Sequence, residues 1–236
     1  MGILVGVHPG GKSKFAVSAV YWNGKLPVAL FHARSYSGVD EVLSDIIGLV
    51  GEWGGLDGVA IDGPLTWSGN PSGWRSSDLA LRKSMPPWLP KSWVKPPNTL
   101  HGAISVQGPA LTWALAREVR QGMLPEHPLF ETHPRLTLAA IARDLREPVL
   151  NYRNRLLSAQ RREQHIARLV ERLVETGIVR IEAEAPKTAD ELDALVCSVV
   201  ALAKIAPATG LITREWVGGD IRPVGKRSIV LLTALP

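Results

Sequence analysis

Four acidic residues stand where short apolar segments begin or end. Asp62 closes the run Gly58-Val59-Ala60-Ile61 before a Gly-Pro turn, Glu131 closes a second apolar run, and Asp190 and Asp193 open a long apolar helix. Acids at strand tips and at a helix start can meet above one edge of a sheet, where loops are free to bind ligands. Two of these acids also have a simpler explanation. Asp62 could simply start the turn, because Asp is common in turns, and Asp190 would complement the helix dipole.

Converging carboxylates need a cation between them. Hard oxygen ligands suit Mg²⁺ or Mn²⁺, and metals held by carboxylates serve phosphodiester hydrolysis. We therefore expect a divalent-metal site with Asp62, Glu131 and Asp193 as catalytic ligands, and Asp190 as a further ligand.

A second feature is an excess of arginine in the middle of the chain. Residues 135–180 contain ten arginines and five acids, and no lysine, while the whole chain has a net charge of +5. The arginine fork donates two parallel hydrogen bonds to phosphate, which favours a nucleic-acid partner, DNA or RNA. A solvated helical face with Glu–Arg pairs is the alternative. The expected phosphate contacts are Arg153, Arg155, Arg161 and Arg162.

The elements that would position the acids begin with three strands. We expect these strands at residues 3–7, 14–22 and 26–31. Asn23-Gly24 lies between the second and third, and is a strong hairpin signal. Apolar residues then recur at helical spacing from Val39 to Trp53, which predicts a crossover helix leading to the strand that ends at Asp62. The predicted fold is a mixed α/β sheet, with a three-strand meander followed by parallel strands.

An insertion of unusual composition, about residues 64–105, follows Asp62. Seven of the eighteen prolines and four of the eight tryptophans lie between Pro64 and Pro97. Long loops in a compact domain are usually functional, and the tryptophans could stack on bases or pin the loop to the core. Arg75, Asp78 and Arg82 share one helical face, as an ion cluster or a substrate clamp.

The remaining elements are mostly helical. We expect helices at 106–121, from Pro134 to near Arg146, and at 155–176 with Leu156 facing inward, then a buried helix after the capping box of Thr188 and Glu191. A hairpin over about 211–233 ends the chain. The pattern predicts one domain over residues 1–236, with Cys197 in its core, no signal peptide and no membrane span. A cytoplasmic protein is expected; the oligomeric state is left open.

This order resembles the ribonuclease H-like superfamily, and Ala189–Leu195 looks like the terminal-helix acid motif of its Holliday-junction resolvase branch. Four stretches are similar to a predicted-nuclease family known as domain of unknown function 429. They are Ala60–Leu65, Arg75–Arg82, Glu131–Arg135 and Asp190–Leu195. The resemblance implies a metal-dependent nuclease, and it adds Arg75, Arg82 and Arg135 to the expected nucleic-acid contacts.

The chain departs from that family at the tip of its first strand. The family pattern has an aspartate there, and this chain has His8. A neutral imidazole brings one nitrogen lone pair and no charge. If His8 is a metal ligand, we expect weakened metal binding and a preference for Mn²⁺ over Mg²⁺.

Two other functions stay open. One is a catalytically silent nucleic-acid-binding protein of the same fold, which lost a ligand at His8. The other is an NTPase, because Gly6–Ser13 matches the P-loop pattern G-x-x-x-x-G-K-[ST]. A P-loop needs a helix starting at Gly11-Lys12, whereas the hairpin signal predicts a strand there.

Overall fold

The computed structural model describes residues 2–10, 14–22, 27–29, 34–100, 103–182, 184–206, 211–218 and 227–233. Within them lies a nine-stranded sheet in the order β7-β3-β2-β1-β5-β6-β9-β8, with β4 also paired to β2. The strands are β1 (Ile3–Gly10), β2 (Lys14–Trp22), β3 (Pro27–Ala29), β4 (Arg34–Tyr36), β5 (Leu56–Asp62), β6 (Leu129–Thr132), β7 (Arg180–Ile181), β8 (Ile212–Gly218) and β9 (Arg227–Thr233).

The pairing of these strands confirms the predicted mixed sheet. β1 and β2 are antiparallel, as are β2 and β3, while β5 and β6 extend the sheet in parallel with β1. Trp22 pairs with Pro27, as a hairpin requires, although Asn23 and Gly24 lie outside the described residues. The described part of the third strand is Pro27–Ala29, within the expected range, and Arg34–Tyr36 forms a separate strand beside β2.

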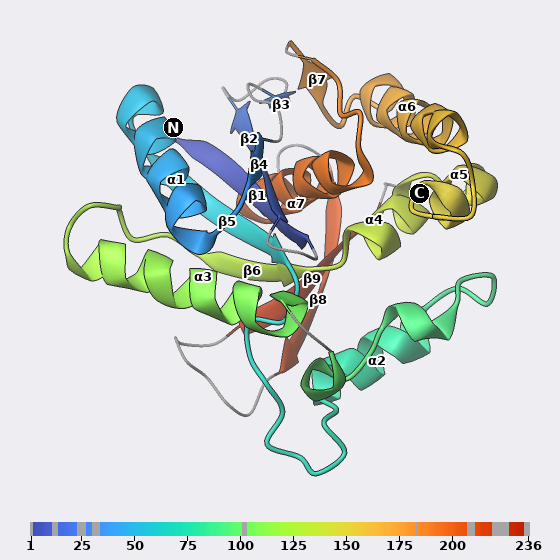
Figure 1. Cartoon of the computed structure of the whole chain (residues 1–236), viewed down its shortest axis with the longest axis horizontal. Helices are drawn as coiled ribbons and strands as arrows, with labels where there is room; N and C mark the ends of the chain where they lie inside the picture. The colour runs from blue at the N-terminus through green and yellow to red at the C-terminus, as the bar shows by residue number, and fades with distance from the viewer. Residues whose placement is uncertain are drawn as a thin grey trace.

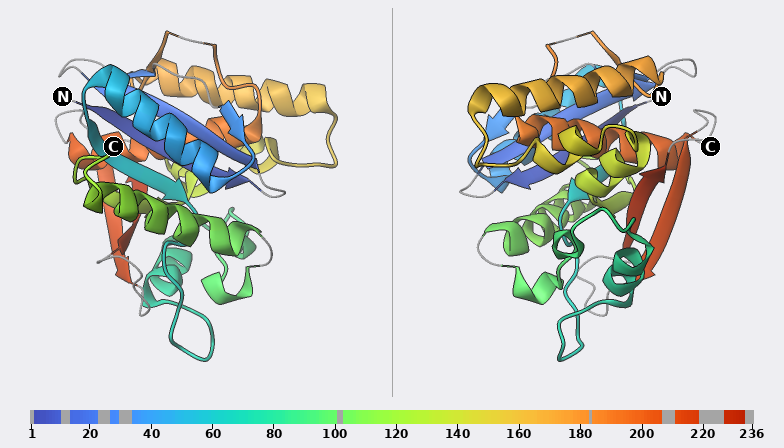
Figure 2. Two further views of the ribbon diagram at one scale, coloured as in Figure 1. Left: turned by 60° about the vertical axis from the view of Figure 1, so that its left-hand side comes forward. Right: turned by 90° about the vertical axis from the view of Figure 1, so that its right-hand side faces the viewer.

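Helices cover both faces of the sheet (Figures 1 and 2). They are α1 (Val39–Trp53), α2 (Ser76–Ser84), α3 (Ala103–Arg120), α4 (Pro134–Ile141), α5 (Arg146–Asn151), α6 (Ala159–Glu175) and α7 (Ala189–Ile205). α1 and α3 share a core with the odd-numbered residues of β1, such as Val5 and Val7. On the other face α7 packs with α4 and α6 in a second core. No helix among the described residues is long and apolar enough to cross a membrane.

Gly6 allows α7 to approach β1 closely. A Cβ at this position would lie 2.1 Å from the carbonyl oxygen of Ala194 and 2.2 Å from the backbone nitrogen of Ser198. Only a residue without a side chain fits there. The middle of β1 is therefore held directly against α7 just after the two aspartates.

The Arg-rich segment differs from the predicted helices. The helix predicted from Pro134 to near Arg146 ends at Ile141. The next predicted helix, α6, begins only at Ala159, because the Ser158 hydroxyl accepts a hydrogen bond from the Arg161 backbone and caps the helix. The prediction that Leu156 faces inward is wrong: it precedes the helix and is 95% exposed.

Tryptophans pin the insertion to the protein body. Trp74, Trp88 and Trp93 are partly buried and pack against the core that contains α7. α2 lies between Trp74 and Trp88, and two 3₁₀ turns follow, η1 (Lys91–Trp93) and η2 (Pro97–Thr99). Near the C-terminus, β8 and β9 form an antiparallel hairpin, and β9 pairs in parallel with β6.

Candidate metal centre

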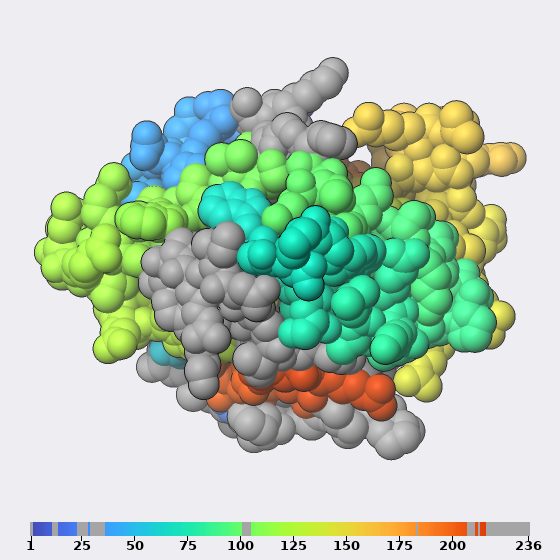
Figure 3. Space-filling view, turned by 90° about the horizontal axis from the view of Figure 1, so that it is seen from below, coloured from blue at the N-terminus to red at the C-terminus, as the bar shows by residue number. Residues whose placement is uncertain are grey.

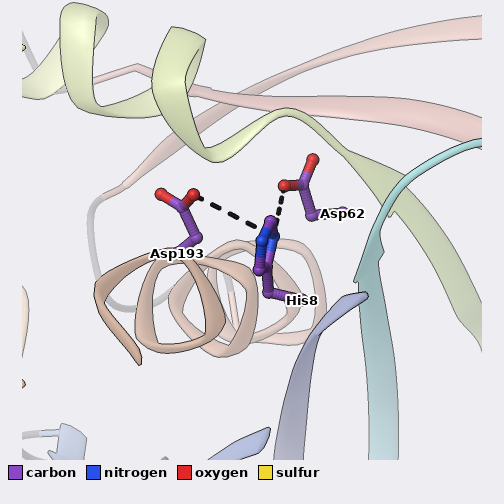
Figure 4. A group of neighbouring side chains, drawn as sticks. All are labelled: His8, Asp62 and Asp193. Carbon is purple, nitrogen blue, oxygen red and sulfur yellow. Dashed lines mark hydrogen bonds and ion pairs between the residues drawn. The ribbon is translucent and has the colours of Figure 1, made fainter. Parts of the chain in front are cut away.

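Side chains from three elements meet at one end of the sheet. Val7 of β1 is the register partner of Ile61 of β5, so the residues that follow, His8 and Asp62, both point to the face covered by α7. Asp193 reaches the same point from the second turn of α7 (Figure 4).

The distances define a compact cluster. His8 Nδ1 lies 2.6 Å from Asp62 Oδ2 and 3.9 Å from Asp193 Oδ2, and one ligand atom from each residue lies within 4.8 Å of the other two. Asp190 Oδ1 is 3.2 Å from His8 Nε2. The Asp193 side chain is fully buried, whereas that of Asp190 is 40% exposed. Asp190 therefore forms the rim of the cluster and Asp193 its floor.

Arg153 also enters this cluster, as an internal cation. Its Nη2 lies 2.5 Å from Asp190 Oδ1, and its Nη1 donates to Asp193 Oδ2. The Tyr152 hydroxyl donates to the other oxygen of Asp193 at 2.7 Å. Burying a carboxylate requires partners of this kind, and here the residues just after α5 provide them.

The charges of the cluster alter its pKa values. Burial by itself lowers the pKa of His8, but hydrogen bonds with Asp190 and Asp62 outweigh it, so that the pKa is raised. For Asp62, burial alone would raise the pKa, and the hydrogen bond from His8 brings it below the ordinary value. The hydrogen bond with His8 also lowers the pKa of Asp190 to about 2.

A proton on His8 Nε2 prevents this nitrogen from accepting a hydrogen bond from Arg153. A protonated ring donates from both nitrogens, to Asp62 and Asp190. A neutral ring with its proton on Nδ1 can instead accept a hydrogen bond from Arg153 Nη2, which lies 3.1 Å from Nε2. The protonation of His8 thus decides whether its Nε2 donates to Asp190 or accepts from Arg153.

The donor set fits one divalent cation. His8, Asp62 and Asp193 offer one nitrogen and two carboxylate oxygens around a single point, with Asp190 beside them. Imidazole with carboxylate suits manganese better than magnesium. A cation bound there would have to displace the contact between Arg153 and Asp193.

Glu131 lies elsewhere, contrary to the predicted ligand set. It pairs in register with Ile61, so its side chain points to the sheet face opposite Asp62. There Arg75 donates to both of its oxygens, at 2.5 and 2.7 Å, and the backbone N–H of Leu65 donates to it at 3.0 Å. Asp78 and His133 form a second group of candidate metal ligands together with Glu131. Arg75 already bridges the two carboxylates of this group, Asp78 and Glu131.

The predicted arginine contacts fall into three groups. Arg75 is buried and makes the ion cluster with Asp78 and Glu131, which leaves it no free face for phosphate. Arg82 stacks on Trp74 at 5.2 Å, and Arg135 lies 3.9 Å from the Trp93 ring centre. The other four belong to the segment around the start of α6.

A cavity of about 300 Å³ adjoins Asp190 at this segment. Arg153, Arg155 and Arg162 line it together with Lys187 and the start of α7, while Arg161 is exposed outside the lining. Sequence reasoning missed Tyr152 and Lys187, and it assigned Arg153 to phosphate alone. In the stretch Asn-Tyr-Arg-Asn-Arg nothing signals contact with residues about forty positions away.

The order β3-β2-β1-β5-β6, with an antiparallel meander and then parallel strands, is the mixed α/β sheet that the sequence predicts. The chain belongs to the family described as protein of unknown function (DUF429), which matches residues 11–212. His8 precedes the matched segment.

Among solved structures, the chain is similar to Thermus thermophilus RuvC in complex with a Holliday junction substrate. The identity is 10%, the TM-score is 0.43, and the match covers 86% of this chain and 96% of that one. No curated protein matches the chain.

Proposed function

We propose that this protein is a divalent-metal-dependent hydrolase of phosphodiester bonds in nucleic acid, a nuclease. The observation that carries the proposal is the convergence of His8, Asp62 and Asp193 from β1, β5 and α7 within 4.8 Å. When bound, a divalent ion would supply the positive charge that polarises the phosphodiester and activates water. Mn²⁺ is the ion we expect, with Mg²⁺ the weaker alternative.

The residues of the cluster would divide the work. Asp62 and Asp193 would hold the cation together with His8 Nδ1, which would lose its proton when the cation binds. Asp190, at the exposed rim, would accept a hydrogen bond from His8 Nε2–H and so orient the ring. Arg153, once released from Asp193, is free to bind a substrate phosphate, because it lines the neighbouring cavity.

The cavity beside Asp190 supports a nucleic-acid partner, DNA or RNA. Four cationic side chains line it against two acids, Glu163 and Asp190. Sequence-independent affinity arises when such groups neutralise backbone phosphates. A cytoplasmic location and a single domain over residues 1–236 stay predictions.

Melting temperatures with and without Mn²⁺ test the cation site. Binding to the folded state should raise the melting temperature of the parent protein, and Asp62→Asn and Asp193→Asn should abolish the shift. Asp40→Asn, an exposed change on α1, is the control. Single-stranded, duplex and branched probes then report cleavage. Equal Mn²⁺ shifts in Asp62→Asn and Asp40→Asn would remove the basis of the proposal.

A catalytically silent nucleic-acid binder is the second candidate, and the Arg153 bridge favours it. If Arg153 permanently replaces the metal, the protein binds probes in EDTA and shows neither a Mn²⁺ shift nor cleavage. Arg153→Gln then only lowers stability, because Asp193 loses its counter-ion. If the protein is instead a metal-dependent nuclease, Arg153→Gln should bind Mn²⁺ more tightly than the parent, because the guanidinium that competes for Asp193 is gone.

The P-loop alternative does not match the fold. β2 begins at Lys14 and pairs antiparallel with β1, with Gly10 opposite Lys14. The chain is therefore a strand from Lys14 onward, where a P-loop continues as a helix, while residues 11–13 lie outside the described part of the chain.

A further inference from the structure

A second cavity lies away from the acid cluster, between α2, α4 and β8. It has a volume of about 300 Å³, and Met85, Trp88 and Leu89 contribute to an apolar floor. Figure 3 shows this side of the molecule, where the insertion and the orange residues of β8 lie next to each other. A volume of this size is at the lower end of the range for small-molecule sites.

Three arginines surround the apolar floor. Arg143 follows α4, Arg146 is the first residue of α5, and Arg214 belongs to β8. None of the three has a carboxylate partner within the described part of the chain, and no acid lines the cavity. The nearby Asp144 is engaged by Arg172, at 2.7 Å. The cavity therefore carries uncompensated positive charge.

Trp88 is the aromatic residue of this lining, and an arginine lies over its ring. The Arg146 guanidinium lies 5.4 Å from the centre of the Trp88 ring. Indole and guanidinium planes both stack on nucleobases. An anion without a flat apolar part would leave the floor of Met85, Trp88 and Leu89 uncovered.

We propose that this cavity binds a nucleoside phosphate, with the base on the Trp88 side and the phosphate among Arg143, Arg146 and Arg214. The nucleotide is either free or one unit of a nucleic-acid strand. The strand version rests on the proposed nuclease function. Arg146 and Arg153 lie seven positions apart across α5, about 10 Å at helical rise. About three nucleotides of a strand span that distance.

The test measures binding in EDTA, so that metal binding and cleavage do not enter. Titration calorimetry uses adenosine monophosphate and a short single-stranded oligonucleotide, with adenosine alone to show the need for phosphate. The variant is Arg143→Gln with Arg214→Gln. The control is Arg117→Gln with Arg120→Gln, which removes the same charge from α3.

Loss of charge-assisted hydrogen bonds should weaken binding through the cavity at least about tenfold in the variant and leave the control near the parent. An effect on the monophosphate identifies a free nucleotide, and an effect on the oligonucleotide alone identifies a strand. Trp88→Leu should weaken the same ligand by loss of stacking. If the variant and the control bind both ligands equally, the proposal is wrong, whatever the Mn²⁺ experiment finds.

Discussion

His8 determines how much negative charge the candidate metal centre offers. It is buried at the tip of β1, in contact with Asp62 and Asp190. We expect His8→Asp to tighten Mg²⁺ binding, because a carboxylate replaces a neutral ligand beside Asp62 and Asp193. Without metal the same variant should melt lower than the parent, since a third negative charge is buried there.

Titration calorimetry with Mg²⁺ and Mn²⁺ checks this expectation. His165→Asp on α6 adds the same charge outside the cluster and serves as the control. Identical Mg²⁺ affinity in the parent and in His8→Asp would exclude position 8 from the metal shell.

Arg75, like Arg153, pairs with two acidic side chains. It is 3% exposed and bridges Asp78 and Glu131, both of them buried. Removing one partner of a buried ion network leaves the others uncompensated, so Arg75→Gln should lower the free energy of unfolding by about 3–5 kcal/mol. Urea denaturation measures the loss.

A second variant separates lost charge balance from lost packing. Adding Glu131→Gln to Arg75→Gln removes one of the unpaired carboxylates and should recover part of the stability. If the double variant is no more stable than the single one, the charge network is not the cause.

At the scale of elements, the start of α6 presents the exposed arginines. Ser158 caps the helix, and Arg155 and Arg161 project into solvent around it. Each phosphate contact contributes about 0.9 to the slope of log affinity against log salt for duplex DNA. Arg155→Gln with Arg161→Gln should therefore reduce the slope by about two.

Binding curves at several salt concentrations give that slope. Arg117→Gln with Arg120→Gln on α3, at a distance from α6 in Figure 1, should leave it unchanged. A slope equal to the parent's in the α6 variant would mean that this face is only solvated.

At the scale of the whole molecule, the C-terminal hairpin covers an edge of the sheet. β9 pairs in parallel with β6, with Glu131 opposite Ile229. A chain truncated after Ala206 would expose the β6 edge, and exposed edges pair with other chains. We expect a lower melting temperature and aggregation on size-exclusion chromatography. Truncation after Thr233 keeps both strands and is the control. A monomeric short chain that melts like the control would show that the hairpin is dispensable.

Local signals in the sequence were enough for much of this architecture. The hairpin between β2 and β3, the crossover helix before Asp62 and the capped start of α7 all depend on turn chemistry and apolar periodicity within a few residues. The convergence of Asp62 and Asp193 followed from the same patterns, because strand tips and a helix start were each recognisable.

Only the tertiary structure decided which acids share a face. Glu131 closes a strand as Asp62 does, but the register places it opposite Ile61, and a shift of one residue moves a side chain to the other side of the sheet. Arg153 reaches Asp190 and Asp193 from 37 and 40 positions away. Such contacts depend on how α5 and α7 pack, and no local pattern encodes them. The exposure of Leu156 depends likewise on where Ser158 starts the helix.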